Sequence, residues 1–184
     1  MQIRDTTDGY GLPTRIVHWL MTVAIIGMYA LGLWIVDLDY YSAYYRSAPD
    51  LHRSVGMLLL GLLIIRFVWR LFNDKPSDEE LSRFERYTSQ IVHWGFYPLL
   101  FALMVSGYLM STADGRPIEV FDWFSVPALV HDKGMEKTAG EIHELLADIT
   151  MALVIVHTLA ALKHHFWDRS RVLPRMWSGP ANDK

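Results

Sequence analysis

The chain has 184 residues, of which 52% are hydrophobic and 13% aromatic, and its formal charge is -3 at pH 7. A mean hydropathy of +0.16 is unusually high for a soluble domain of this size. The absence of cysteine excludes disulfides, thiolate zinc sites, iron–sulfur clusters, cysteine nucleophiles and covalently attached haem. Because there is no excess of Lys and Arg, we expect no nucleic-acid partner.

Four stretches approach the ~20 apolar residues that cross the hydrocarbon core of a bilayer. They cover residues 16–36, 54–72, 91–110 and 142–162. The first carries no charged residue and is longer than a signal-peptide core, so we interpret it as a retained helix. The sequence therefore predicts an all-α fold, an integral membrane four-helix bundle. It forms one transmembrane domain over 1–184, with a longer connecting segment at 111–141.

Lys and Arg residues divide unevenly between the two ends of such a bundle. Twelve of the 17 fall on the side that holds both termini and the linker between the second and third stretches. By the positive-inside rule, both termini are predicted to be cytoplasmic. Segment 111–141 then faces outward, and the chain is predicted to be a multi-pass protein in the lipid bilayer of a bacterial inner membrane.

The histidines fall into two layers once the four stretches are given alternating directions. His52 and His143 begin the second and fourth stretches, near the outer surface. His18 and His157 lie near the inner surface, and His93, early in the third stretch, shares that inner level. Polar side chains at this depth are costly, so their placement calls for a functional reason.

The fourth stretch carries one histidine at each layer. His143 and His157 lie on nearly the same face of one helix, separated along its axis by about 21 Å. Such a helix suits two stacked haem b groups, each held by a pair of histidines from two helices. Spacing alone leaves open whether His18 or His93 pairs with His157.

Arginines also lie at both layers. Arg53 follows His52, and Arg66 and Arg70 share one helix face near the inner end of the second stretch. These guanidinium groups are candidates to pair with haem propionates. Basic residues at a cytoplasmic helix end also set the topology without any ligand, so that alternative stays open for Arg66 and Arg70.

The residues around the histidines resemble the prokaryotic cytochrome b561 family. The resemblance runs from about residue 10 to 176 and rests on three segments: RIVHW (15–19), LHRSVG (51–56) and IHELLADITMALVIVHTLAALKHHFWDR (142–169). It implies four helices that bind two b haems per chain. It implies further that His52 and His143 hold the outer haem and that His18 and His157 hold the inner haem.

Members of that family pass electrons between the periplasmic side and the quinone pool, and some are assigned superoxide oxidase activity. The resemblance thus implies an oxidoreductase or electron-transfer protein that exchanges electrons with ubiquinone or another quinone. It places the quinone near the cluster of Lys163, His164 and His165, where imidazole can move the protons that quinone reduction needs. A cationic anchor at the membrane face is the alternative role of Lys163 and His165.

The charge of the outer side bears on the periplasmic electron donor. Eleven acidic residues fall outward of the bundle or in its outer half, against five basic residues. A negative face does not steer superoxide, which is an anion, and it suits a basic redox protein equally well. Superoxide and a redox protein both remain candidate donors.

Three classes of protein remain at this point. The first is a dihaem cytochrome that exchanges electrons with quinone, either free-standing or as the haem-binding membrane subunit of a periplasmic oxidoreductase. The second is a His-lined metal-ion transporter without haem, which would need more midplane carboxylates than Asp148. The third is a structural anchor, which does not need histidines on matched levels. The donor, the direction of electron flow, the quinone type and the oligomeric state, a homodimer included, stay open.

Overall fold

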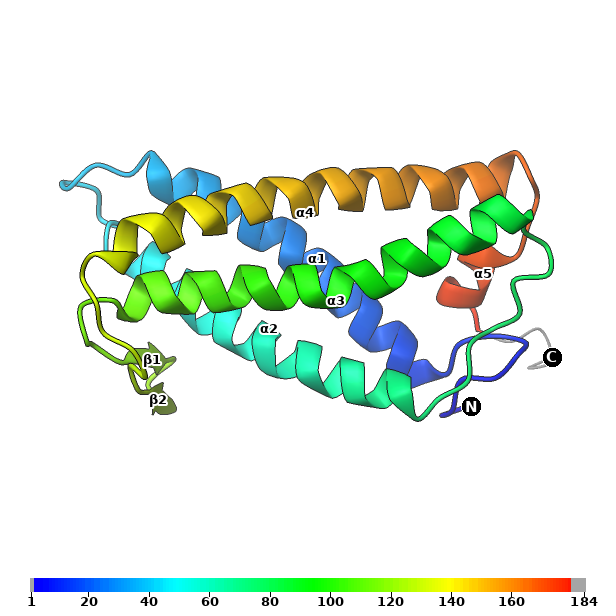
Figure 1. The fold of residues 1–184 in the computed structure, drawn as a ribbon, viewed down its shortest axis with the longest axis horizontal. Helices are drawn as coiled ribbons and strands as arrows, with labels where there is room; N and C mark the ends of the chain where they lie inside the picture. The colour runs from blue at the N-terminus through cyan, green and yellow to red at the C-terminus, as the bar shows by residue number, and fades with distance from the viewer. Residues whose placement is uncertain (1, 180–184) are drawn as a thin grey trace.

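The structure is a computed structural model that describes residues 2–179. Four long helices extend along the molecule (Figure 1), namely α1 (Leu12–Val36), α2 (Ser47–Leu71), α3 (Arg83–Thr112) and α4 (Met135–Phe166). Each packs against the next, and α4 also meets α1. A short helix, α5 (Val172–Trp177), follows α4.

All four long helices have the length and composition to cross a membrane. Their outward side chains are apolar as well, since Val23 is 71% exposed and Ile65 64% exposed. Helices that are hydrophobic around their whole circumference suit a lipid surround, because lipid then covers the outer faces. The chain is therefore a membrane four-helix bundle, which confirms the predicted fold class.

The helices extend beyond the apolar stretches of the sequence. α2, α3 and α4 begin at Ser47, Arg83 and Met135, several residues before the predicted 54, 91 and 142. α3 begins with a capping box in which Glu85 N–H donates to Ser82 Oγ and Ser82 N–H donates to Glu85 Oε2. Apolar length therefore locates the hydrocarbon core, whereas the start of α3 is marked by its polar capping box.

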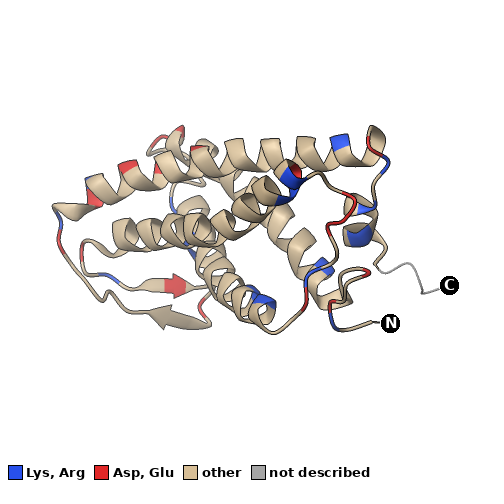
Figure 2. Ribbon diagram, turned by 45° about the vertical axis from the view of Figure 1, so that its right-hand side comes forward, with Lys and Arg blue, Asp and Glu red and all other residues tan. Residues whose placement is uncertain are grey.

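The start of α1 and the short helix α5 lie at the same end of the bundle, together with the start of α3 and the ends of α2 and α4 (Figure 1). Several Lys and Arg residues gather at this end, and acidic residues follow the other half of α4 (Figure 2). Lys184, which was counted with the basic residues of this side, lies outside the described residues. We call this the inner end.

The orientation of the chain in the membrane is a testable prediction. A reporter that works only in the cytoplasm should be active when it is fused after Lys184 and inactive when it is inserted near Gly134, because Lys and Arg retain their loops in the cytoplasm. A periplasmic reporter at the same two positions is the control. Activities in the reverse order would invert the donor and acceptor sides.

A small hairpin closes the outer end beside α2. Its strands are β1 (Ile118–Val120) and β2 (Phe124–Val126), paired antiparallel. Ser54 Oγ of α2 donates to the carbonyl oxygen of Glu119 at 3.1 Å and accepts from the Phe121 N–H at 3.3 Å. The hairpin is a small departure from the predicted all-α fold, and it fixes the connecting segment over the level of the outer histidines.

A cluster of buried apolar side chains lies between the two histidine levels. Met21, Leu59, Leu63 and Leu100 form a cluster of buried side chains contributed by α1, α2 and α3. Because these residues lie along the helices between the outer and inner histidines, the cluster separates the two histidine levels.

Candidate functional site

The outer histidines meet across two helices. His52 on α2 and His143 on α4 have ring centres 6.1 Å apart, with ring planes at 75°. A metal ion bound about 2 Å from one nitrogen of each ring would hold the ring centres roughly 6 Å apart. The two imidazoles thus have the spacing of two ligands of one metal ion.

The two rings of this outer pair differ in their surroundings. His143 Nδ1 lies 2.9 Å from the carbonyl oxygen of Leu103 and 3.3 Å from Ser106 Oγ. With its proton on Nδ1, His143 donates to that carbonyl and keeps Nε2 free as a ligand atom. His52 Nδ1 is buried and has no hydrogen-bond partner among residues 2–179.

Three histidines share the inner level. His157 on α4 contacts His93 on α3, with ring centres 5.3 Å apart. His18 on α1 contacts Trp19, and its Nδ1 is also buried without a partner in the part of the chain that the structure describes. The structure therefore brings His93 against His157 in direct ring contact, while His18 approaches the pair from α1.

These histidines fit a haem iron. Imidazoles from different helices meet at both levels of the bundle, with 6.1 Å between the ring centres of His52 and His143 and 5.3 Å between those of His93 and His157. The four histidines of the predicted ligand set supply the neutral imidazole that haem iron accepts. His18, His52, His143 and His157 could thus hold two haems, one at each level.

The candidate propionate partners differ in their present contacts. Arg53 is ion-paired with Asp50 one turn earlier on α2. Arg70 donates to the carbonyl oxygen of Asp74 at 3.2 Å. Arg66 makes no such contact among the described residues, and it lies near the inner histidines. Arg66 is therefore the arginine most free to bind an anionic group at the inner level.

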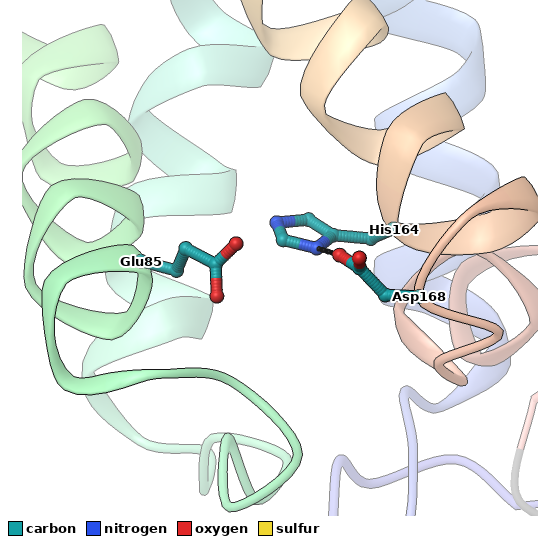
Figure 3. Close-up of side chains that lie close together, drawn as sticks. All are labelled: Glu85, His164 and Asp168. Carbon is teal, nitrogen blue, oxygen red and sulfur yellow. Dashed lines mark hydrogen bonds and ion pairs between the residues drawn. The ribbon is translucent and has the colours of Figure 1, made fainter.

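An ion-paired cluster joins α3 and α4 at the inner end (Figure 3). Lys163 Nζ lies 2.6 Å from Glu85 Oε1 and 2.8 Å from Asp168 Oδ2. His164 Nδ1 lies 2.7 Å from Asp168 Oδ2, and the imidazole points toward Glu85. Glu85, His164 and Asp168 have donor atoms within 4.8 Å of one another, as a metal site would. The Lys163 ammonium already bridges the two carboxylates, however, so an ion-paired network accounts for the cluster.

The sequence predicted Lys163 and His164 but missed their carboxylate partners. Asp168 lies four residues after His164, a spacing that places two residues on one helix face and that could have pointed to it. Glu85 lies 78 residues before Lys163, and no local pattern links them. Glu85 reaches the cluster only because α3 packs against α4 in the folded chain.

The ion pairs of Asp168 predict how the stability of the fold depends on pH. Its hydrogen bond to Lys163, and next the one to His164, hold the pKa of the Asp168 carboxyl below its ordinary value of 3.8. A lowered pKa in the folded state stabilises the fold above the unfolded-state pKa, and this contribution is lost as pH falls through the folded-state pKa. We therefore expect the thermal midpoint of Asp168→Asn to fall less steeply below about pH 4 than that of the unmodified protein.

Asp37→Asn is the control for this measurement. Asp37 lies at the outer end of α1, and its carboxylate makes no hydrogen bond or ion pair within residues 2–179. Parallel pH dependence of the Asp168→Asn variant and the unmodified protein would show that the cluster contributes nothing to acid stability.

A membrane bundle that pairs histidines across its helices has the ligands with which a membrane electron-transfer cytochrome holds haem. A model of the family described as prokaryotic cytochrome b561 matches residues 9–179, and the chain belongs to this family. The match confirms the resemblance seen in the sequence, and membership implies binding of haem b. A haem-free transporter and a purely structural anchor are no longer supported.

Curated relatives agree with this family. The chain is 43% identical over 185 residues to "Cytochrome b561 homolog 2" of Escherichia coli (strain K12), covering 100% of this chain and 98% of that protein. It is 24% identical over 163 residues to "Probable superoxide oxidase CybB" of Yersinia pestis, covering 87% of this chain and 90% of that protein. "Cytochrome b561 homolog 1" of Escherichia coli (strain K12) is 21% identical over 164 residues.

Proposed function

We propose that this chain is a dihaem cytochrome b that passes electrons across a bacterial inner membrane between a periplasmic donor and the quinone pool. The observation that carries the proposal is the placement of histidines from different helices at two levels of one bundle, with 6.1 Å between the outer ring centres. A single haem would leave one level of histidines unexplained. When bound, the two haems supply one-electron transfer between these levels.

The protein's own side chains hold and orient the cofactors. His52 and His143 are the proposed ligands at the outer level, and His18 and His157 at the inner level. His93 is the alternative partner of His157, supported by their 5.3 Å ring contact. Arg66 is the best placed of the three arginines for a propionate, since Arg53 and Arg70 already have protein partners.

The inner-end cluster supplies the proposed quinone site. With its proton on Nδ1, His164 donates a hydrogen bond to the Asp168 carboxylate, so Nε2 is free to exchange a proton with a quinone oxygen. Lys163 is engaged with Glu85 and Asp168, and it fixes the cluster in place. Because the cluster lies at the inner end, the protons for quinone reduction would come from the cytoplasm.

Charge at the outer end favours a basic redox protein as donor. Three of the five basic residues there are already neutralised by ion pairs: Arg53 with Asp50, Arg116 with Asp114 and Lys137 with Glu141. Few positive charges remain to attract an anion. Superoxide is the second candidate donor, favoured by the likeness to a probable superoxide oxidase.

Liposomes that carry the protein and ubiquinone in their bilayer test the proposal. A basic, low-potential c-type cytochrome, supplied reduced on the outside, should reduce this quinone with uptake of protons from the lumen, at a rate that falls as ionic strength rises. Enzymatically generated superoxide is tested in parallel, and faster quinone reduction by superoxide would favour the second candidate. A protein that binds two haems but reduces quinone with neither donor would overturn the proposed transmembrane transfer.

A further inference from the structure

Three residues of α3 surround the imidazole of His143. Leu103, Ser106 and Gly107 share one face of α3, because they are spaced by three and four residues. The Leu103 carbonyl oxygen lies 2.9 Å from His143 Nδ1, and Ser106 Oγ lies 3.3 Å from it. Ser106 Oγ also donates to the Leu103 carbonyl at 2.7 Å, so both oxygens converge on one imidazole nitrogen. We call Leu103, Ser106 and Gly107 the α3 cradle.

Gly107 allows the imidazole to lie this close to α3. A Cβ atom built on Gly107 would lie 2.8 Å from His143 Cε1 and 3.0 Å from Nδ1, whereas ordinary contact begins near 3.4 Å. Glycine inside a helix costs about 1 kcal/mol relative to alanine, so the residue needs a reason. The backbone of Gly107 is ordinary helix, and the approach of His143 supplies that reason.

The cradle distinguishes His143 from the other proposed ligands. His18 and His52 each have a buried Nδ1 without a partner in the part of the chain that is described, and the ring of His157, which packs against His93 and Phe96, makes no hydrogen bond there. A hydrogen bond donated from Nδ1 makes an imidazole a stronger electron donor to a metal on Nε2, which favours the oxidised metal. This electronic effect falls on the outer level alone.

We propose that the α3 cradle fixes the tautomer and ring orientation of His143 and thereby lowers the reduction potential of the outer haem. Leu103, Ser106 and Gly107 are positioning residues, since they act through His143. The inference rests on the proposed function, because it assumes that His143 binds haem. It adds a specific cause for a difference in potential between the two levels.

Gly107→Ala tests the cradle, with Gly95→Ala as a matched control. Gly95 lies on the same helix, and a Cβ built there has no neighbour within 4 Å. In Gly107→Ala the added methyl pushes the ring off the Leu103 carbonyl, so we expect the midpoint potential of one haem to rise while that of the other is unchanged. Gly95→Ala should leave both potentials unchanged. Potentiometric titration of the purified protein at full haem content measures this, and unshifted potentials in Gly107→Ala would overturn the proposal.

A measurement on the unmodified protein tests the proposed orientation of His143 even if Gly107→Ala fails to fold or loses the outer haem. The ring of His143, which the cradle holds, lies at 75° to the ring of His52. Nearly perpendicular ligand planes give a highly anisotropic low-spin EPR signal in the oxidised protein, and His52→Ala should abolish that signal. An ordinary rhombic signal from the outer haem would overturn the cradle while leaving the dihaem proposal intact. Protein without haem would contradict both.

Discussion

Replacing His143 by alanine is expected to halve the haem content of the purified protein, from two haems per chain to one. The imidazole of His143 lies opposite His52 with the ring spacing of two ligands of one metal ion, and a haem b without covalent attachment depends on its axial ligands. His52→Ala should have the same effect. Extracted haem per chain, together with the low-spin b-type absorption spectrum, measures the loss.

His131→Ala is the matched control for this pair. His131 is exposed in the segment before α4, outside the helical bundle, so its loss should leave both haems bound. A fully folded but colourless preparation of the unmodified protein would contradict haem binding altogether. Loss of both haems in every histidine variant would indicate a general effect on folding and not loss of a ligand.

The inner level needs a comparison of two variants, because three histidines meet there. His18→Ala is expected to remove the inner haem and to leave the outer haem in place. His93→Ala is expected to retain both haems, although His93 is the ring in direct contact with His157. An empty inner site in His93→Ala, with both haems retained in His18→Ala, would reassign the ligand to α3.

The number of helices and the levels of the histidines could be predicted because both depend on local properties of the chain. An apolar run reports the depth of a residue in the membrane, so His52 and His143 could be assigned to the same level from sequence alone. The hairpin could not be predicted. β1 and β2 have only three residues each, too few for an alternating pattern to stand out.

The closest contacts of the site could not be predicted either, because they depend on the rotation of one helix against another. The sequence gives no sign that the Leu103 carbonyl faces His143, since this requires α3 and α4 to meet along particular faces. The same is true of Glu85 and Lys163, which meet at the inner end of these two helices. Levels along the membrane normal are thus easier to predict than neighbours within a level.

Replacing His164 by alanine is expected to slow reoxidation by quinone without changing haem content. General acid–base catalysis by a positioned side chain contributes roughly 100-fold to 10,000-fold, so the loss should reach about 100-fold if His164 exchanges protons with the quinone. None of the proposed haem ligands hydrogen-bonds to His164 among residues 2–179. Both haems should therefore remain bound and reducible by an outer donor. Stopped-flow reoxidation by added ubiquinone measures the change.

The neighbouring His165 provides the matched control, and Asp168 tests the positioning of His164. His165 packs on Phe166, with ring centres 4.7 Å apart, and makes no hydrogen bond to the cluster within the described chain. His165→Ala should therefore reoxidise at the normal rate. Asp168→Asn should be slowed less than His164→Ala, because the imidazole remains but loses the carboxylate that orients it.

Unchanged quinone turnover in His164→Ala would move the quinone site away from this cluster. The outer end near Trp123, which is 74% exposed in the turn of the hairpin, would then be the first alternative to test.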